Sequence, residues 1–149
     1  MRVADYVVKA LVDFGLRHVF LVTGGGAMHL NDAFTRNNQI TPVCFHHEQA
    51  CSMAADGYAR LCGQPAVVNV TTGPGAINAL NGVFGAFTDS IPMVIIGGQV
   101  KTETIKGQYN SALRQLGDQE VDIVGMVKPV SKYAVVLQDP QDTRRVVEK

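Results

Sequence analysis

The sequence predicts an α/β fold in three α/β/α layers, with a mainly parallel open sheet covered by helices on both faces. Short β-branched apolar runs alternate with longer stretches of helical apolar spacing over the first hundred residues. The short runs are almost continuously apolar, as in strands buried on both faces. With 46% hydrophobic and 17% charged residues, the 149-residue chain has enough apolar material for the core of one domain.

The expected elements follow one another regularly. Strands are expected at residues 18–22, 41–45, 66–70 and 92–96. Helices are expected at residues 3–14, 27–36, 48–61 and 76–87. Gly15 and Gly63 follow the first and third helices as stop signals. Because a helix connects each strand to the next, right-handed crossovers would set all four strands parallel.

Apolar spacing also predicts which helix faces are buried. The inner face of the third helix would comprise Ala50, Met53, Ala54, Gly57 and Leu61. The inner face of the fourth helix would comprise Ala76, Leu80, Val83, Phe84 and Phe87. Large apolar side chains of both helices are therefore expected to pack inside the domain.

The last third of the sequence is less regular. The polar stretch at residues 101–118 is long for a loop in a compact domain, so we expect it to be functional or to pack on a partner. A short helix near 120–127, a strand near 130–136 and a helix from Asp139 would complete the fold. Because that last helix stops at Lys149 without a cap, we expect residues 1–149 to be a single amino-terminal domain of a longer polypeptide.

Composition argues against several classes of function. Thirteen Lys and Arg balance thirteen Asp and Glu, and no basic run has interleaved aromatic residues, so no nucleic-acid partner is expected. No apolar run approaches the length of a membrane span, so no membrane partner is expected. The three cysteines lack CxxC spacing, which argues against a disulfide framework or a zinc site. These features are typical of a soluble cytoplasmic protein.

Three glycines follow the first expected strand and precede a helix. In this position the backbone N–H groups of Gly24, Gly25 and Gly26 could cradle a ligand. Their spacing matches neither the dinucleotide-binding pattern nor the Walker loop. A simple tight turn between strand and helix explains them equally well.

The next two strands also end in residues that could meet a ligand. Glu48 opens the third helix, although a first-turn carboxylate is also favoured by the helix dipole alone. Thr72 and Pro74 follow the third strand, and both are ordinary helix-starting residues. Because the carboxyl ends of parallel strands share one edge of the sheet, we expect these segments to lie together, where such sheets bind ligands.

Other reactive side chains fit ordinary structural roles. His46 and His47 are adjacent, so on an extended chain they point to opposite faces and are poorly placed to share a metal ion. Cys51 and Cys62 lie among small helical residues and are expected to pack inside the fold. We therefore predict no metal ligand in this chain.

Several segments together resemble the amino-terminal domain of thiamine-diphosphate enzymes. They are Val-Thr-Gly-Gly-Gly at 22–26, His-Glu-Gln-Ala at 47–50, Ala-Ala-Asp-Gly-Tyr-Ala-Arg at 54–60, Thr-Gly-Pro-Gly-Ala-Ile-Asn at 72–78 and Asp-Ser-Ile-Pro at 89–92. Gly-Gly-Gln-Val at 97–100 and Gln-Glu at 119–120 extend the resemblance toward the acetolactate synthase large subunit. The resemblance covers nearly the whole chain in order.

The resemblance implies a pyrimidine-binding domain and a role for each matching position. Glu48 would hydrogen-bond N1′ of the cofactor's aminopyrimidine and serve as the catalytic carboxylate of the proton relay that ionises C2 of the thiazolium. The cofactor-binding residues implied are Gly24, Gly25, Gly26, Thr72, Pro74, Asn78 and Gln119. The activity implied is decarboxylation of a pyruvate-like 2-keto acid and ligation to a second carbonyl compound.

Departures from the family pattern bear on the substrate. Residues 117–120 read Gly-Asp-Gln-Glu, where acetolactate synthases typically have Ala-Phe-Gln-Glu. The histidine pair of pyruvate decarboxylases is absent between residues 101 and 119, which disfavours simple decarboxylation. Glyoxylate carboligase lacks the glutamate, so the presence of Glu48 argues against that activity as well.

Half of the expected cofactor site is missing from this sequence. The family binds the diphosphate and Mg²⁺ through Gly-Asp-Gly and a later Asn, which this chain lacks. In the family the two halves come from different subunits, so the resemblance implies a homodimer or tetramer and an inactive isolated fragment. It leaves FAD in the complete enzyme open. The alternative is a non-catalytic α/β module that binds a nucleotide-like ligand or serves as an assembly subunit.

Overall fold

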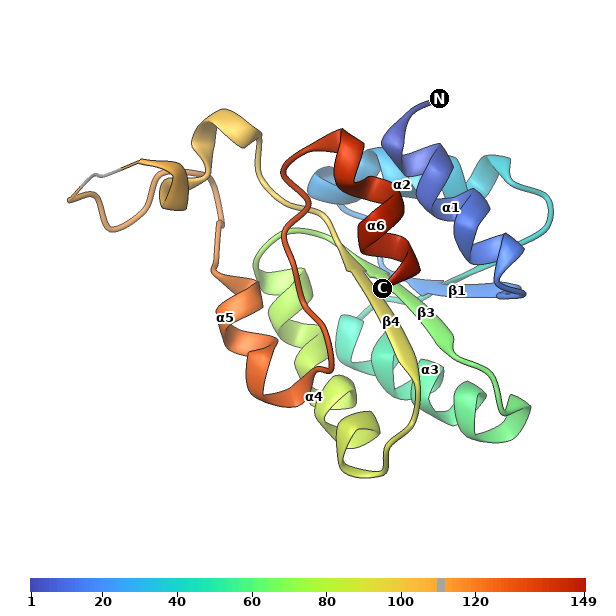
Figure 1. Ribbon diagram of the computed structural model, residues 1–149. Helices are drawn as coiled ribbons and strands as arrows, with labels where there is room; N and C mark the ends of the chain where they lie inside the picture. The colour runs from blue at the N-terminus through green and yellow to red at the C-terminus, as the bar shows by residue number, and fades with distance from the viewer. Residues whose placement is uncertain (110–111) are drawn as a thin grey trace.

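The computed structural model describes residues 1–109 and 112–149, and within them a four-stranded sheet forms the centre of the molecule (Figure 1). The strands are β1 (His18–Leu21), β2 (Thr41–Cys44), β3 (Ala66–Val70) and β4 (Met93–Gly97). They lie in the order β2-β1-β3-β4, and every neighbouring pair is parallel. The predicted parallel α/β sheet is confirmed.

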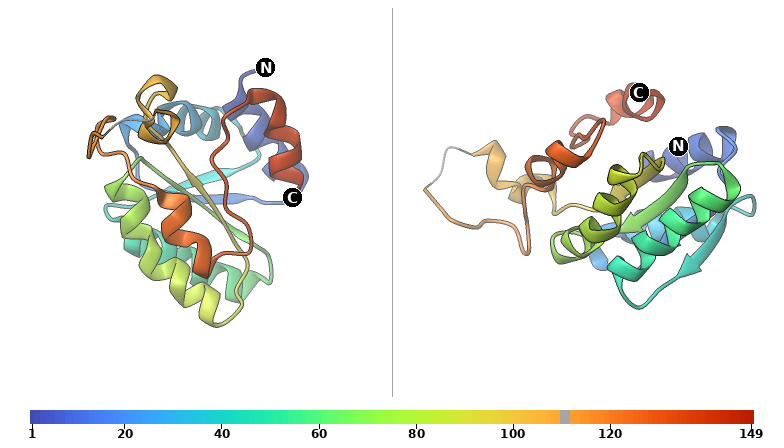
Figure 2. Two further views of the ribbon diagram at one scale, coloured as in Figure 1. Left: turned by 60° about the vertical axis from the view of Figure 1, so that its left-hand side comes forward. Right: turned by 90° about the horizontal axis from the view of Figure 1, so that it is seen from below.

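Helices cover both faces of the sheet, which gives the three α/β/α layers (Figures 1 and 2). On one face lie α1 (Val3–Asp13), α2 (Met28–Arg36) and the carboxyl-terminal α6 (Thr143–Glu148). On the other lie α3 (Glu48–Cys62) and α4 (Pro74–Thr88), with α5 (Ile123–Val127) packed against α4. Because α1 contacts α6, the two ends of the chain lie on the same side of the sheet. None of the helices in the described part is both long and apolar enough to cross a bilayer.

The sheet separates two hydrophobic cores, because successive side chains along a strand point to opposite faces. Val19, Leu21 and Val67 belong to the core shared with α1 and α2. Phe20 and Val68 belong to the core shared with α3 and α4. All five side chains are buried, so the central strands β1 and β3 carry apolar residues toward both layers. This double burial explains why these two strands read as nearly continuous apolar runs.

Asn69 interrupts the apolar sequence of β3. This residue is fully buried, and its side-chain Nδ2 donates a hydrogen bond of 2.7 Å to Oδ1 of Asn31 on α2. Its own Oδ1 finds no hydrogen-bond partner among the described residues. The Asn69–Asn31 bond ties α2, and with it the glycine turn before α2, to the middle of the sheet.

Short turns of 3-10 helix complete the chain. They span Gly25–Ala27, Thr102–Thr104, Lys106–Gln108, Lys128–Val130 and Pro140–Asp142. The 3-10 turns at Thr102–Thr104 and Lys106–Gln108, which follow β4, extend away from the sheet (Figures 1 and 2). The short helix that the sequence places from about residue 120 begins at Ile123, because Oδ1 of Asp122 accepts a hydrogen bond of 2.9 Å from the N–H of Gly125 and caps it.

The predicted inner faces of α3 and α4 are largely wrong. The buried residues of α3 are Cys51, Ser52, Ala55 and Ala59, and those of α4 are Gly75, Ala76, Ala79, Gly82 and Ala86. Met53, Leu61, Phe84 and Phe87 are exposed instead. The two helices pack too closely for large side chains between them, because a Cβ on Gly82 would lie only 2.7 Å from the backbone N of Met53. Small residues therefore form the contact.

The predicted strand near residues 130–136 is also wrong. This segment runs from the 3-10 turn at Lys128–Val130 to the one at Pro140–Asp142 without strand structure. Its apolar and β-branched residues favour a strand, but a strand forms only when a neighbour pairs with it. Within the described residues β4 pairs with β3 alone.

Candidate functional site

The carboxyl ends of the four parallel strands meet at one edge of the sheet. The glycine turn follows β1, Glu48 follows β2 after a short connection, and Thr72 follows β3. The Gly97–Gly98 step lies at the end of β4. Segments that are up to about seventy residues apart in the sequence therefore come together, at the edge where open parallel sheets bind ligands.

The turn after β1 packs against the start of the turn after β3. The backbone N–H of Gly26 donates a hydrogen bond of 3.1 Å to Oγ1 of Thr71. The α-carbon of Gly24 lies directly against the side chain of Thr71, and that of Gly26 lies against Oγ1 of Thr72. Neither glycine has room for a side chain, so both are needed for this close approach.

Thr72 carries an unusual hydroxyl group at this edge. The residue is buried, and its Oγ1 has no hydrogen-bond partner among the described residues. Buried hydroxyl groups are nearly always hydrogen-bonded, so an orphaned one needs an explanation such as a missing ligand or solvent molecule. Thr72 is thus a candidate binding residue on structural grounds as well as on sequence grounds.

The end of β4 closes the same edge. The N–H of Gly98 donates a hydrogen bond of 2.9 Å to the carbonyl of Val70, and its α-carbon lies against the carbonyl of Gly26. Sequence reasoning missed both Gly98 and Thr71 as site-forming residues. Both follow predicted strands, and Gly98 also belongs to the Gly-Gly-Gln-Val motif at 97–100.

Glu48 is the first residue of α3, and His47 caps that helix. Nδ1 of His47 accepts a hydrogen bond of 3.2 Å from the N–H of Gln49. The Glu48 side chain is half-buried, and its Oε2 accepts a hydrogen bond of 3.2 Å from Nδ2 of Asn78 on α4. A Cβ on Gly75 would lie 3.1 Å from Oε1 of Glu48. The carboxylate is therefore held beside the first turns of α4.

Cys51 lies buried one turn behind Glu48 on α3. Burial, together with the nearby Glu48 and Cys44, raises the pKa of the Cys51 thiol to about 12. The thiol therefore stays protonated at neutral pH and packs as a small apolar group, as the sequence predicts. Cys62, for which packing was also predicted, is exposed.

Gly73 joins the edge to the segment before α5. Its φ of +56° lies in the region that side chains disfavour, and its α-carbon packs against the backbone carbonyl of Gln119. Gln119 itself has a φ of +58°, an uncommon conformation for a residue with a side chain. Such strained residues cluster at functional sites, so the backbone favours the sequence prediction for Gln119.

Hydrogen bonds brace the segment that carries Gln119. The N–H of Lys106 donates to both carboxylate oxygens of Glu120 at 2.9 Å. Nε2 of Gln115 donates to the carbonyls of Gly117 and Glu120 at 2.9 and 2.8 Å. The turn that places Gln119 against Gly73 is thus held from both sides.

The structure therefore brings most of the predicted site residues to one edge. Contacts link Gly24, Gly26, Thr72, Glu48, Asn78 and Gln119 to it, either directly or through Thr71, Gly73 and Gly75. Pro74 is the first residue of α4 and is exposed, and a Cβ on Gly25 would meet open space. Those two positions belong to the edge but make no such contact.

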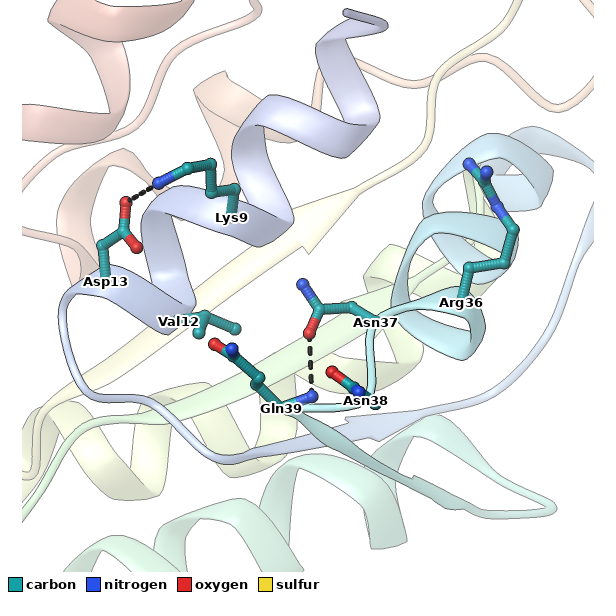
Figure 3. A pocket seen from close by; sticks show the side chains of 7 residues that line it. All are labelled: Lys9, Val12, Asp13, Arg36, Asn37, Asn38 and Gln39. Atoms are coloured by element: carbon teal, nitrogen blue, oxygen red, sulfur yellow. Dashed lines mark hydrogen bonds and ion pairs between the residues drawn. The ribbon is translucent and has the colours of Figure 1, made fainter.

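A separate depression of about 480 Å³ lies at the opposite edge of the sheet, between the end of α1 and the segment before β2 (Figure 3). It is lined by Lys9, Val12, Asp13, Arg36, Asn37, Asn38 and Gln39. Its charged groups are already engaged in ion pairs, Lys9 with Asp13 and Arg36 with Asp5 and Asp32. None of the predicted site residues lines it. No group of three or more His, Cys, Asp or Glu side chains suited to a metal ion occurs in the described residues.

Residues 1–126 match the family described as "Thiamine pyrophosphate enzyme, N-terminal TPP binding domain". The chain belongs to this thiamine pyrophosphate enzyme family. It is 40% identical over 146 residues to the acetolactate synthase isozyme 3 large subunit of Escherichia coli K12, covering 98% of the chain and 24% of that protein. It is 38% identical to the acetolactate synthase large subunit of Buchnera aphidicola from Acyrthosiphon pisum, with the same coverage.

Plant relatives are nearly as similar. The chloroplastic acetolactate synthase of Arabidopsis thaliana is 36% identical over 146 residues, which cover 98% of the chain and 21% of that protein. The chain thus spans about a quarter of the length of the curated relatives it matches. Membership in the family, which the sequence motifs predict, is confirmed.

Proposed function

We propose that this chain is the pyrimidine-binding domain of a longer thiamine-diphosphate enzyme that decarboxylates a pyruvate-like 2-keto acid and ligates the product to a second carbonyl compound. The observation that carries the proposal is the Glu48 carboxylate, held beside Asn78 and Gly75 at the ligand-binding edge. The family match and the acetolactate synthase relatives support the same activity and do not favour the non-catalytic alternative.

The residues at the edge fit an aminopyrimidine ring. A flat ring needs backbone without side chains nearby, which Gly24, Gly25 and Gly26 supply. Its ring nitrogen needs a carboxylate partner, which Glu48 supplies, and its polar edge needs hydrogen-bonding groups. The unpartnered hydroxyl of Thr72 is an orphaned buried group that such a ligand would explain.

In the proposed mechanism Glu48 would hydrogen-bond N1′ of a bound aminopyrimidine and would hold a proton at that atom. Gly24 to Gly26 and Pro74 would line the ring, and Thr72 and Gln119 would supply polar contacts to it. Asn78 would contact the carboxylate of Glu48. Thiamine diphosphate, when bound, supplies the carbanion-stabilising chemistry that the side chains lack. The chain's own contribution is orientation, exclusion of water and this one proton transfer.

The proposed enzyme is an assembly of at least two subunits, a homodimer or a tetramer. Ile77, Phe84 and Phe87 recur at helical spacing on α4 and are 39%, 59% and 50% exposed. Such an apolar stripe favours burial against another protein surface.

We place the diphosphate and Mg²⁺ site in a domain outside this chain, and any FAD of the complete enzyme would also bind outside this chain. Three free cysteines suit a cytoplasmic location.

Glu48→Gln in the complete enzyme tests the proposed role of Glu48. A glutamine keeps the shape but is a far weaker proton acceptor, so exchange of the cofactor's C2 proton should slow by a factor on the order of 10² to 10⁴. The measurement is hydrogen–deuterium exchange of bound cofactor followed by NMR. Glu148→Gln, on α6 at the other face of the sheet, is the matched control and should exchange normally. Normal exchange in Glu48→Gln would refute the role of Glu48.

Calorimetry tests the domain assignment. Thiamine diphosphate with Mg²⁺ should bind tightly to the complete enzyme and weakly to residues 1–149, because the diphosphate half of the site lies elsewhere. Tight binding of a different nucleotide by residues 1–149 alone would instead favour the non-catalytic module.

A further inference from the structure

Asn78 and Glu48 form a side-chain hydrogen bond between the amino-terminal ends of α3 and α4. Asn78 lies in the second turn of α4, and its Nδ2 lies 3.2 Å from Oε2 of Glu48. The other oxygen, Oε1, faces the bare α-carbon of Gly75 one turn earlier on α4. Both oxygens of the Glu48 carboxylate therefore lie against residues of α4.

We infer that Asn78 is a positioning residue, which acts by fixing the carboxylate of Glu48 and not by contacting the cofactor itself. This inference rests on the proposed function, because the proposed function assigns to Glu48 the hydrogen bond to the pyrimidine ring. It differs from the role that the family resemblance implies, in which Asn78 is a polar neighbour of the cofactor.

The chemistry of the pair supports a positioning role. A glutamate at the first position of a helix has several free torsions, and fixing them costs conformational entropy each time a ligand binds. An amide N–H that donates to a carboxylate makes a stronger hydrogen bond than one between two neutral groups. Asn78 therefore orders Glu48 before the ligand arrives, and this preorganisation favours tighter binding.

The bond leaves the carboxylate free to act. An ionised carboxylate offers about four acceptor positions on its two oxygens, and Asn78 occupies one of them. Gly75 presents no side chain to Oε1. A ring N–H can therefore reach Glu48 without displacing Asn78, so the two contacts are compatible.

The close packing of α3 on α4 supplies the required rigidity. Gly82 lies against Ser52, so the two helix axes cannot drift without losing this contact. Both partners of the hydrogen bond are thus carried by helices whose separation is fixed. Contacts on rigid helices hold a functional group more accurately than contacts on loops.

The contact itself can be tested by NMR on the 149-residue chain, without any cofactor. Glu48→Ala should shift the side-chain amide resonances of Asn78 and speed the rotation and exchange of that amide. Asn81, an exposed asparagine on the same helix, is the matched control, and its side-chain amide should not change. Unchanged Asn78 resonances in Glu48→Ala would overturn the inference at its first step.

A double-mutant cycle on thiamine diphosphate affinity in the complete enzyme tests the mode of action. Asn78→Ala should weaken binding about tenfold, the loss expected for a hydrogen bond to a charged group. In a Glu48→Ala background the same change should cost almost nothing, because Asn78 then has no carboxylate to hold. Equal losses in both backgrounds would show a direct cofactor contact and overturn the inference. Asn81→Ala should bind normally in either background.

Asn78→Asp separates positioning from simple packing. Aspartate keeps the shape of asparagine but replaces the donor with a second carboxylate beside Glu48, so binding should weaken more than in Asn78→Ala. Binding equal to the wild type in Asn78→Asp would show that only the shape matters, against the inference. If the wild-type enzyme itself fails to bind thiamine diphosphate, the proposed function fails, while the NMR result still decides whether the contact exists.

Discussion

Gly82→Ala and Gly85→Ala are expected to change stability in opposite directions. Both glycines lie inside α4, where alanine is favoured over glycine by about 1 kcal/mol through helix propensity. A Cβ at position 85 meets nothing within 4 Å, so Gly85→Ala should stabilise the fold by up to about 1 kcal/mol. A Cβ at position 82 would press on Oγ of Ser52 and lie 2.7 Å from both N of Met53 and C of Ser52.

Two of the three atoms that crowd position 82 are backbone, so they cannot rotate away as a flexible side chain could. The helices would have to separate, and overpacking of this kind typically costs about 1–3 kcal/mol. With a cost at the upper end of that range, Gly82→Ala should be destabilised by about 2 kcal/mol after the propensity gain. The two variants should then differ by about 3 kcal/mol.

Urea unfolding of the 149-residue chain, followed by circular dichroism at 25 °C, measures this difference. The slope of the free energy against urea should stay the same in the two variants, so that the midpoints can be compared. If Gly82→Ala is as stable as Gly85→Ala, the close approach of α3 and α4 at this position does not exist. The physical account of why these helices bury small residues would then be refuted.

Two further predictions concern Cys51 and Gly73. Iodoacetamide at pH 8 should modify the exposed Cys44 and Cys62 in the native chain but reach Cys51 only after denaturation, and native labelling of Cys51 would contradict its burial. Folding raises the pKa of the Cys51 thiol from 9.0 to about 12, so the protonated thiol adds stability below pH 9. This stability is lost as the pH rises toward 12, and the urea midpoint of unfolding should fall across that range. Gly73→Ala should cost about 1–3 kcal/mol of stability and displace Gln119. Alanine disfavours the φ of +56° at this position, and its methyl group has no room against the Gln119 carbonyl. Amide chemical shifts that change only beside residue 73, and not at Gln119, would contradict the expected displacement of Gln119.

Much of the candidate site could be predicted from the sequence because its parts are local. Glycines after β1, a carboxylate at the start of α3 and the Thr-Gly-Pro-Gly turn after β3 each fit a strand-to-helix junction. Parallel strands bring such junctions to one edge, so topology alone predicts their proximity. The hydrogen bond between Asn78 and Glu48 could not be predicted, because it depends on the distance between two helices.

The sequence by itself determined the fold class, the four strands of the sheet and the place of Glu48 at a strand-to-helix junction. These features follow from periodicity and turn residues, which act over a few neighbouring positions. Only the tertiary structure decided which faces of α3 and α4 are buried, since that depends on how closely Gly82 approaches Ser52. It also left residues 131–139 without strand structure, because β pairing requires a partner from another part of the chain.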